Sequence, residues 1–451
     1  MIIAYKEHFQ FIMILIIMYV LGVWGGPVIY PLFPLVMILF GIRQRYFEML
    51  IISLWLLILS DYVPVSDATY DDLQFAKDLK FLVPLFLFGF FLLNRYDFSP
   101  LPKLILWFLP FFICAIIALQ FSIDFKTGLE KTISYVLMFV VIPFYVATLH
   151  REKGELFWKS LMTFIIGMLA IGIVLRFVAP QIAMLNGTRF KGILGNPNGL
   201  GIFLNLTFIL WVIVREFKLA TFTKRENWYI LIVIIISLLW SGSRNGMMSI
   251  FLFFLIANLV KVHWFFAIIA VMMVLTFSDQ IFDLFIGIIE FFNLQDYFRI
   301  ESIEEGSGRK IAWIFAWQEI QNYYFIGGGF GQDESVMRPN YYWLSKLGHQ
   351  GGVHNSYLSL WFDVGIVGLV LYLVGFIGII INAMRNNYLA LAFGISILFN
   401  INYESWLVAS LSPYAIMFLI ILTILSANLT GSDYVAEIEQ QPILESQTNA
   451  I

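Results

Sequence analysis

The chain has 451 residues, of which 60% are hydrophobic, 18% aromatic and only 13% charged. Soluble domains carry roughly 25% charged residues, so the composition excludes a water-soluble globule and predicts an all-α polytopic integral membrane protein. The net charge of −3 gives no basic character for binding nucleic acid. Because Cys114 is the single cysteine, an intrachain disulfide is excluded. Cys114 lies in an apolar run, so we expect it to fill space in the core as a small apolar side chain.

Hydrophobic segments follow one another along most of the chain. A bilayer core of about 30 Å needs about 20 apolar residues per helix. The second, third, tenth and thirteenth segments are short, so we expect between twelve and fourteen spans. Fourteen are predicted, at residues 9–25, 27–42, 46–60, 80–94, 102–121, 131–149, 158–178, 199–214, 227–240, 246–260, 263–278, 356–382, 388–402 and 408–428.

The basic residues predict how these spans are oriented, because short cytoplasmic loops are enriched in Lys and Arg. With the N-terminus in the cytoplasm, the inner loops receive 14 of the 27 basic residues, and the outer loops before the long one receive eight. The acidic loop between the third and fourth spans then lies outside. We therefore expect both termini on the cytoplasmic side of a bacterial inner membrane.

The spans divide the chain into four parts: an N-terminal bundle of about eleven helices at 1–278, a long outer loop at 279–355, C-terminal helices at 356–428 and a tail at 429–451. A loop of this length is usually functional or disordered. Its aromatic residues predict a packed structure with short helices, and the segment Arg309–Gln321 predicts an amphipathic helix. The tail is rich in Glu and Gln, and we expect it to be disordered.

Four polar clusters fall on the expected outer face, at residues 186–198, 241–246, 306–310 and 351–356. An Arg at a membrane boundary can simply anchor a helix end. Several cations flanked by Gly and Asn fit phosphate binding better, because guanidinium forks and closely approaching backbone N–H groups suit phosphate oxygens. The cations of these clusters are Arg189, Lys191, Arg244, Arg309 and Lys310.

His354 lies where the long loop re-enters the membrane. An imidazole there could accept a proton from a sugar hydroxyl, although an interfacial His bonded to a carbonyl is the alternative. His349 is expected to face solvent, and the two do not form an HExxH zinc motif. Gly327–Gly331 lacks the Lys-Ser/Thr of a P-loop and predicts a tight turn. Asp363, inside the twelfth span, is expected to be structural, with orientation of the His354 region as the alternative.

The sequence from His354, H-N-S-Y-L-S-L-W-F-D-V-G-I-V-G, resembles the His-[Asn/Ser/Gln]-x9-Gly-x2-[Gly/Thr/Tyr] signature of the bacterial O-antigen ligase and O-antigen polymerase superfamily. The positions that meet it are His354, Asn355, Gly365 and Gly368. Upstream, G-N-P-N, S-G-S-R-N-G and G-R-K-I-A-W follow in order. The resemblance covers about residues 185–370, and the earlier spans match only in general character.

This resemblance implies a metal-independent, cofactor-free glycosyltransferase of GT-C-like architecture that takes a glycan from undecaprenyl diphosphate on the outer face of the inner membrane. By carry-over, Arg189 and Arg244 would hold the diphosphate, together with Lys191 in the same loop as Arg189. His354 would activate the acceptor hydroxyl, and Arg309 would support the donor or the loop. In-line attack predicts inversion at the anomeric carbon. A flippase and a chain-length regulator are the further partners that this role suggests.

Three functions stay open at this point, besides a purely structural membrane subunit. The number of spans favours a polymerase that joins lipid-linked repeat units, from an O-antigen, capsule or exopolysaccharide. A ligase would instead transfer the glycan to the lipid A core. A flippase or other transporter would place ionisable residues near the midplane and often shows inverted repeats, whereas this chain places its cations at the outer mouth. The sugar, the linkage, the chain length and the oligomeric state are not indicated.

Overall fold

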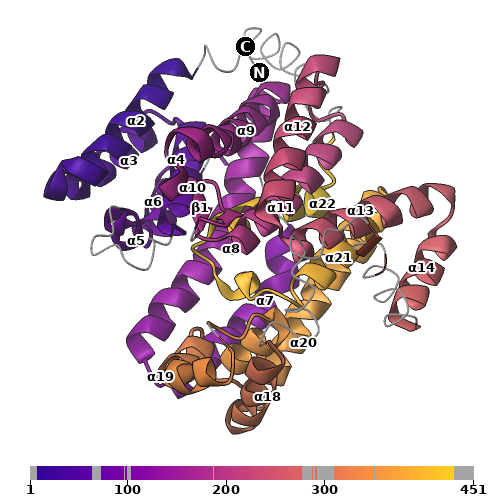
Figure 1. Cartoon of the computed structure of the whole chain (residues 1–451). Helices are drawn as coiled ribbons and strands as arrows, with labels where there is room; N and C mark the ends of the chain where they lie inside the picture. The colour runs from indigo at the N-terminus through magenta and orange to yellow at the C-terminus, as the bar shows by residue number, and fades with distance from the viewer. Residues whose placement is uncertain are drawn as a thin grey trace, which may run out of the picture. The chain divides into compact units, whose positions relative to one another are not determined.

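The computed structural model describes residues 8–62, 73–95, 97–98, 103–185, 187–276, 287, 290–291, 309–349 and 351–430. Within these ranges every regular element is helical except one short hairpin (Figure 1), which confirms the all-α prediction. Much of the first half of the predicted outer loop, the start of the third polar cluster at 306–308, and residues 431–451 of the tail lie outside the described residues.

Each predicted span corresponds to a helix. Among the described residues, six helices are long and apolar enough to cross a membrane, and six shorter apolar helices accompany them. The chain is therefore a multi-pass membrane protein, while the choice between twelve and fourteen spans stays a prediction. The six long helices are Lys103–Phe121, Phe125–Lys153, Glu155–Val178, Pro197–Glu216, Arg244–Val262 and Ser356–Met384.

The chain packs as two compact units, each assembled from segments that are distant in the sequence. The first unit comprises Met1–Leu106, Ser134–Ser241 and Leu411–Ile451. Its boundaries fall inside α7 (Lys103–Ala118) and α8 (Phe125–Lys153). Its other described elements are α2 (Phe9–Trp24), η1 (Gly26–Val28), α3 (Ile29–Ile42), α4 (Tyr46–Ser60), α5 (Gln74–Leu79), α6 (Leu82–Leu93), α9 (Glu155–Val178), α10 (Pro180–Ala183), α11 (Pro197–Glu216), α12 (Lys224–Ser241) and α22 (Pro413–Ala427).

The centre of the first unit is built from α4, α11 and α22. A helix that is hydrophobic all round is expected to be buried on every side, and every residue of α4 is buried. Helix α22 is almost as fully buried and packs against both α4 and α11. After α10, the chain makes a two-stranded antiparallel hairpin, β1 (Met184–Leu185) with β2 (Arg189–Phe190), in which Leu185 pairs with Arg189. This hairpin places Arg189 next to the helices of the unit.

The second unit comprises Trp107–Ile133 and Gly242–Ser410. Helices α13 and α21 pack closely, and polar side chains join them: Ser396 Oγ donates to Ser249 O at 2.9 Å, and Asn400 Nδ2 donates to Ser249 Oγ at 2.9 Å. Such polar contacts bind helices together in a membrane. Besides part of α7 and α8, the elements are η2 (Leu119–Phe121), α13 (Arg244–Val262), α14 (Trp264–Thr276), α18 (Arg309–Ile320), η4 (Gln321–Tyr323), α19 (Gln332–Lys346), α20 (Ser356–Met384), α21 (Leu389–Asn400) and η5 (Trp406–Val408).

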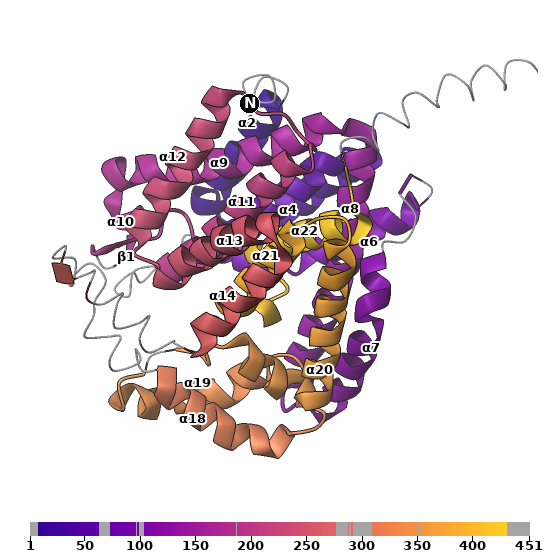
Figure 2. The ribbon, with the colours of Figure 1, turned by 90° about the vertical axis from the view of Figure 1, so that its right-hand side faces the viewer.

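The described second half of the outer loop is folded, as its aromatic content predicts. Helix α18 coincides with the expected amphipathic segment, and α18 and α19 both pack against α20 (Figure 2). Ala312, Ala316 and Ile320 of α18 form a buried cluster with Met337 and Phe362. The described part of the loop is therefore packed against the first half of α20.

Helix α20 is interrupted at Gly365, one of the two signature glycines. Its φ of 66° and ψ of 179° lie in a region that only glycine occupies readily, and a Cβ there would overlap the carbonyl of Phe325. The freed backbone pairs with the preceding segment, since Ile366 N donates to Tyr324 O at 2.8 Å. The fold thus requires glycine at this position.

The glycine-rich segment Gly327–Gly331 fits into this interruption. Three of its glycines have positive φ, at 82°, 82° and 91°, so the predicted tight turn is confirmed. Gly331 N donates to Asp363 Oδ1 at 3.1 Å, and Asp333 N donates to the same oxygen at 3.3 Å. Asp363 therefore holds the turn, which confirms its predicted structural role. Cys114 is buried beside it, with Sγ 3.7 Å from Val364 O.

Candidate active site

Three of the four predicted polar clusters supply the side chain that caps the N-terminus of a helix. Asn196 Oδ1 accepts from Gly199 N at 2.8 Å, Ser243 Oγ from Gly246 N at 3.3 Å, and Asn355 Oδ1 from Leu358 N at 3.1 Å. Asn and Ser are preferred at such N-caps because their side chains satisfy an orphan backbone N–H. Helix capping thus explains the Asn and Ser residues of these motifs. The caps fix the helix starts, and Arg244 and His354 lie next to two of them.

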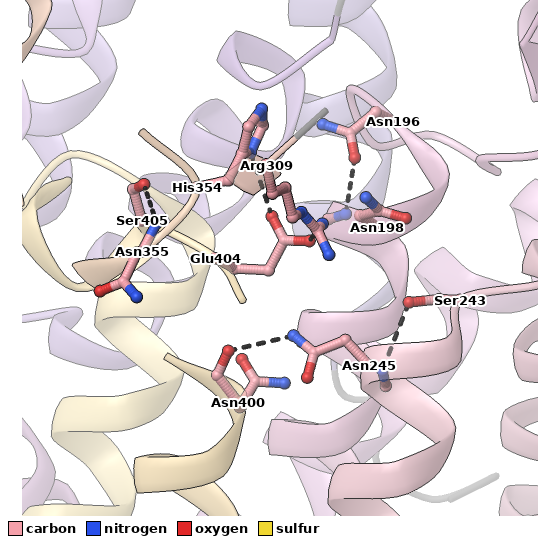
Figure 3. Close-up of polar contacts among 12 residues, drawn as sticks. Asn196, Asn198, Ser243, Asn245, Arg309, His354, Asn355, Asn400, Glu404 and Ser405 are labelled. Carbon is pink, nitrogen blue, oxygen red and sulfur yellow. Dashed lines mark hydrogen bonds and ion pairs between the residues drawn. The ribbon is translucent and has the colours of Figure 1, made fainter. Parts of the chain in front are cut away.

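Glu404 joins two of the predicted catalytic residues, both in the second unit. Arg309, the first residue of α18, donates from Nη2 to Glu404 Oε1 at 2.8 Å. His354 Nδ1 lies 3.7 Å from the other carboxylate oxygen, Oε2. Figure 3 shows the carboxylate between the guanidinium and the imidazole. Glu404 is buried and His354 is about one-third exposed, so the His side chain is accessible while its carboxylate partner is shielded.

His354 has a strained backbone, with a φ of 51°. Non-glycine residues seldom occupy this left-handed region, and when they do the surrounding structure holds them there, most often at functional sites. Gly351 leaves the room that this requires, because a Cβ at Gly351 would lie 2.8 Å from His354 Nε2. The loop before α20 is thus shaped around the imidazole.

His349 supports the same loop, and the prediction that it faces solvent is wrong. Its side chain is buried, with only 2% of its surface exposed. Its Nε2 donates to the carbonyls of Gly351 at 3.1 Å and Gly352 at 3.0 Å, which requires the Nε2–H tautomer. Burial lowers the pKa of His349, and the neighbouring charge of His354 lowers it further. Its ring centroid lies 5.9 Å from that of His354.

The segment that carries Glu404 is fastened to the start of α20. Ser356 N donates to Ile401 O at 2.8 Å, and Ser356 Oγ donates to the Glu404 carbonyl at 2.6 Å. Asn355 N donates to Ser405 Oγ at 3.0 Å. The two residues that follow the signature His therefore set the position of Glu404 relative to His354.

Arg244 begins α13 and belongs to the same unit. The next residue, Asn245, donates to Asn400 O at 3.0 Å (Figure 3), and Trp406 Nε1 donates to Asn400 Oδ1 at 2.8 Å. The start of α13 is thus tied to the segment that contains Glu404. Arg244 itself is half-buried.

Arg189 lies in the first unit, on β2. Its Nε donates to Ser241 O at 3.1 Å and its Nη2 to Asn198 Oδ1 at 3.1 Å. These bonds connect the hairpin with the end of α12 and the start of α11. The guanidinium is half-buried, and it brings two of the predicted polar clusters together.

Lys191, two residues further on, is completely buried. Its Nζ lies 3.9 Å from the centre of the Tyr62 ring. Burial lowers the pKa of Lys191 to about 8, and the charge of Asp61 partly opposes this. Asp61 in turn accepts from Gly195 N at 2.9 Å and from the Tyr414 hydroxyl at 2.7 Å. Lys191 therefore lies among the buried residues that pack behind the Arg189 loop. Lys310, by contrast, is exposed.

The structure thus brings Arg309 and His354 together through Glu404, ties the Arg244 helix to the same segment, and places Arg189 and Lys191 in one loop of the first unit. Sequence reasoning missed Glu404. The available signal was that it is the one acidic residue between the last two predicted spans. Among the described residues no three His, Cys, Asp or Glu side chains form a metal-binding group.

A histidine backed by a buried carboxylate can take up a proton at Nε2, because the carboxylate stabilises the imidazolium that forms. The fold and this site define a multi-pass, all-α membrane protein with a His–Glu–Arg centre. Residues 229–373 match the model of the O-antigen ligase family, which supports the similarity of this chain to the superfamily of O-antigen ligases and polymerases. The resemblance seen in the sequence is confirmed. A search of curated proteins gave no match.

Proposed function

We propose that the protein is a polymerase that joins undecaprenyl-diphosphate-linked oligosaccharide repeat units on the outer face of the bacterial inner membrane. The family acts on lipid-linked glycans, and the His354–Glu404–Arg309 arrangement supplies a base for an acceptor hydroxyl. The observation that carries the proposal is the position of the Glu404 carboxylate, 3.7 Å from His354 Nδ1 and 2.8 Å from Arg309 Nη2.

In the proposed step, His354 Nε2 takes the proton from the acceptor hydroxyl. The oxygen attacks the anomeric carbon of the donor from the side opposite the diphosphate, so the new glycosidic bond forms with inversion. The bond from that carbon to the diphosphate breaks, and its electron pair stays on the lipid diphosphate. Glu404 stabilises the imidazolium through Nδ1, and a separation of 3.7 Å leaves room for this contact to tighten when substrate binds.

The positively charged residues have two proposed roles: some stabilise the leaving group, and others position the catalytic side chains. Arg189 and Arg244 are proposed to hold the diphosphate, whose growing charge fixed guanidinium groups stabilise without a metal. Arg309 positions Glu404 and thereby His354. Lys191 is completely buried, so we propose that it contributes its charge from behind the Arg189 loop.

The test is the variant Glu404→Gln in purified protein supplied with lipid-linked repeat units. The amide keeps the shape of the side chain but cannot stabilise an imidazolium, so we expect elongation to slow by about 10²-fold or more. Glu319→Gln in α18 is the matched control and should elongate normally. Unchanged elongation in Glu404→Gln, with normal protein levels, would contradict the catalytic role of this centre.

A ligase is the second function to test, because the matching family is described as O-antigen ligase. The discriminating reaction supplies the protein with lipid-linked repeat units alone, and then with lipid A core added. A polymerase extends chains without the core. Transfer that depends strictly on the core would establish the ligase and overturn our proposal.

A further inference from the structure

Asp61 follows the last residue of α4 and contacts the loop that carries Arg189. Its Oδ2 accepts from Gly195 N at 2.9 Å and from the Tyr414 hydroxyl at 2.7 Å. Helix α4 is buried along its whole length, and α22 packs against both α4 and α11. This carboxylate therefore joins the end of α4, the start of α22 and the segment that precedes α11.

The same contact explains two glycines of the segment Gly195–Gly199. A Cβ at Gly195 would overlap the Asp61 carbonyl, and a Cβ at Gly199 would overlap the Tyr414 hydroxyl. The sequence pattern suggested that glycines in this cluster allow a phosphate to approach, whereas these two allow Asp61 and Tyr414 to approach. The segment is thus shaped around the carboxylate and its phenol partner.

The contact at Gly195 bears directly on Arg189. Three residues after Gly195, in the first turn of α11, Asn198 Oδ1 accepts from Arg189 Nη2 at 3.1 Å. Pro197 lies between them and restricts the backbone of this short segment. A shift of Gly195 would therefore move the acceptor of Arg189, and Asp61 is the side chain that accepts from Gly195 N.

The buried ammonium of Lys191 interacts with the charge of Asp61. Burial lowers the pKa of Lys191 to about 8, and the charge of Asp61 opposes this lowering. The ring of Tyr62, the residue after Asp61, lies 3.9 Å from Lys191 Nζ. A tyrosine is neutral below about pH 10, so of these two neighbours Asp61 is the one that can carry a negative charge near neutral pH.

Four neighbours favour the ionised form of Asp61 against its burial. Burial raises the pKa of Asp61, whereas the hydrogen bonds from Tyr414 and Gly195 and the charges of Lys80 and Lys191 lower it. Donors and opposite charges stabilise a carboxylate in this way even when it is shielded from water. Asp61 and Lys191 therefore stabilise the charged forms of each other.

We propose that Asp61 is a positioning residue of the diphosphate site: its carboxylate holds the Gly195 end of the Arg189 loop and pairs electrostatically with the Lys191 ammonium. The inference rests on the proposed function, which assigns the donor diphosphate to Arg189 and Arg244 with the charge of Lys191 behind the loop. In this role Asp61 acts through the loop and does not touch the substrate.

Two substitutions separate the two parts of this role. In Asp61→Asn the amide oxygen can accept the same two hydrogen bonds while the charge is lost, and Asp61→Ala removes both. The matched control is Asp78→Asn, at an exposed residue of α5 whose carboxylate accepts from Tyr30 and Gln74 instead. The full-length proteins in nanodiscs are titrated with undecaprenyl diphosphate, and Kd is measured from about pH 6 to about pH 9, the range in which Lys191 is expected to titrate.

In wild type and in Asp78→Asn we expect Kd to rise about threefold or more as the pH passes 8, because Lys191 then loses its charge. In Asp61→Asn the same rise should begin about one pH unit lower, since the opposite charge is gone. Asp61→Ala should raise Kd a further ~3-fold or more at every pH, because Gly195 N then loses its acceptor.

A second pair of variants tests whether Asp61 acts through Lys191. Without the titrating ammonium, Lys191→Met and the double variant Asp61→Asn with Lys191→Met should both show a Kd that does not rise near pH 8. A pH shift caused by Asp61→Asn that persists in the Lys191→Met background would overturn the electrostatic pairing.

Three other results would overturn the proposal. They are a rise at the same pH in Asp61→Asn as in wild type, an Asp61→Ala Kd equal to that of Asp61→Asn, and an equal shift in Asp78→Asn. The pH shift is measured on Asp61→Asn, which keeps the hydrogen bonds, so this test holds even where Asp61→Ala does not fold.

Binding and elongation together separate this inference from the proposed function. If wild type and Asp61→Asn show the expected binding profiles but wild type does not extend glycan chains, the role of Asp61 stands and the polymerase fails. If Asp61→Asn binds with the wild-type profile, while wild type elongates and Glu404→Gln does not, the role of Asp61 fails and the enzyme stands.

Discussion

His354 depends on its neighbours at the scale of single residues. Its left-handed backbone, with φ at 51°, is stabilised where Gly351 leaves room for the imidazole and His349 bonds the carbonyls of Gly351 and Gly352. A substitution that removes the imidazole must tolerate this backbone. Asn does so best among residues with a β-carbon, so His354→Asn tests the chemistry with less strain than His354→Ala.

His349 is expected to act as a positioning residue. In His349→Gln the amide nitrogen can still donate to the two glycine carbonyls, whereas His349→Leu leaves them buried without a donor, at a cost of about 1–3 kcal/mol. Elongation should fall about tenfold or more in His349→Leu and be largely retained in His349→Gln. Equal activity in the two variants would show that the hydrogen bonds do not position the site.

The pH dependence of stability checks the same residue. Burial lowers the pKa of His349 from its ordinary 6.5, so below that pH the unfolded chain takes up the proton first. Stability is therefore lost as the pH falls from 6.5 towards the folded-state pKa. Unfolding temperatures measured across this range should show a smaller acid loss in His349→Gln than in wild type. An identical loss of stability in the two proteins would show that titratable groups other than His349 cause it.

Lys191 gives a prediction on the alkaline side. Its pKa is lowered from 10.5 to about 8, so between these values the native state releases the proton while the unfolded chain keeps it. The free energy of unfolding should consequently rise with pH across this window. Thermal unfolding should show the rise in wild type and in the exposed-site control Lys310→Met but not in Lys191→Met. A rise that persists in Lys191→Met would contradict the burial of this ammonium.

At the scale of elements, the non-helical backbone of Gly365 interrupts α20. Gly365→Ala forces a side chain into a backbone region that only glycine occupies readily and against the carbonyl of Phe325, so we expect a loss of about 2–4 kcal/mol. Gly89→Ala, in the open part of α6, should instead be neutral or stabilise by up to about 1 kcal/mol. Thermal unfolding measures both. A Gly365→Ala variant as stable as wild type would contradict the interruption.

The elements were the most predictable part of the fold, because the length of an apolar segment alone indicates a membrane helix. The short polar clusters were harder to interpret. Asn196, Ser243 and Asn355 lie in motifs that suggested phosphate binding, yet each caps a helix. Both uses favour the same residues, since a helix N-terminus needs acceptors and a phosphate needs the N–H groups found there.

The contacts of the site could not be predicted, because tertiary packing sets them. Glu404 is 95 positions from Arg309 and 50 from His354, and Asp61 meets Tyr414 across 353 positions. No local pattern records such pairs. His349 was placed wrongly for the same reason: only the folded structure shows that its side chain is buried, between exposed Gly348 and half-buried Gly351.

At the scale of the whole molecule, the predicted residues are distributed over two units. Arg309, Glu404, His354 and Arg244 belong to the second unit, and Arg189 with its loop belongs to the first. Each unit is assembled from segments distant in the sequence, so we expect the proposed reaction to need the full chain. Experiments on isolated fragments would separate residues that the proposed reaction uses together.

The most direct measurement is glycan-chain elongation by the purified full-length protein supplied with undecaprenyl-diphosphate-linked repeat units and no lipid A core. Wild type and the control His263→Asn, at the end of α13, should both produce a ladder of extended products. His354→Asn should produce none while it binds the donor and unfolds at the same temperature as wild type. A ladder from His354→Asn equal to that of wild type would contradict the role of this histidine as the base.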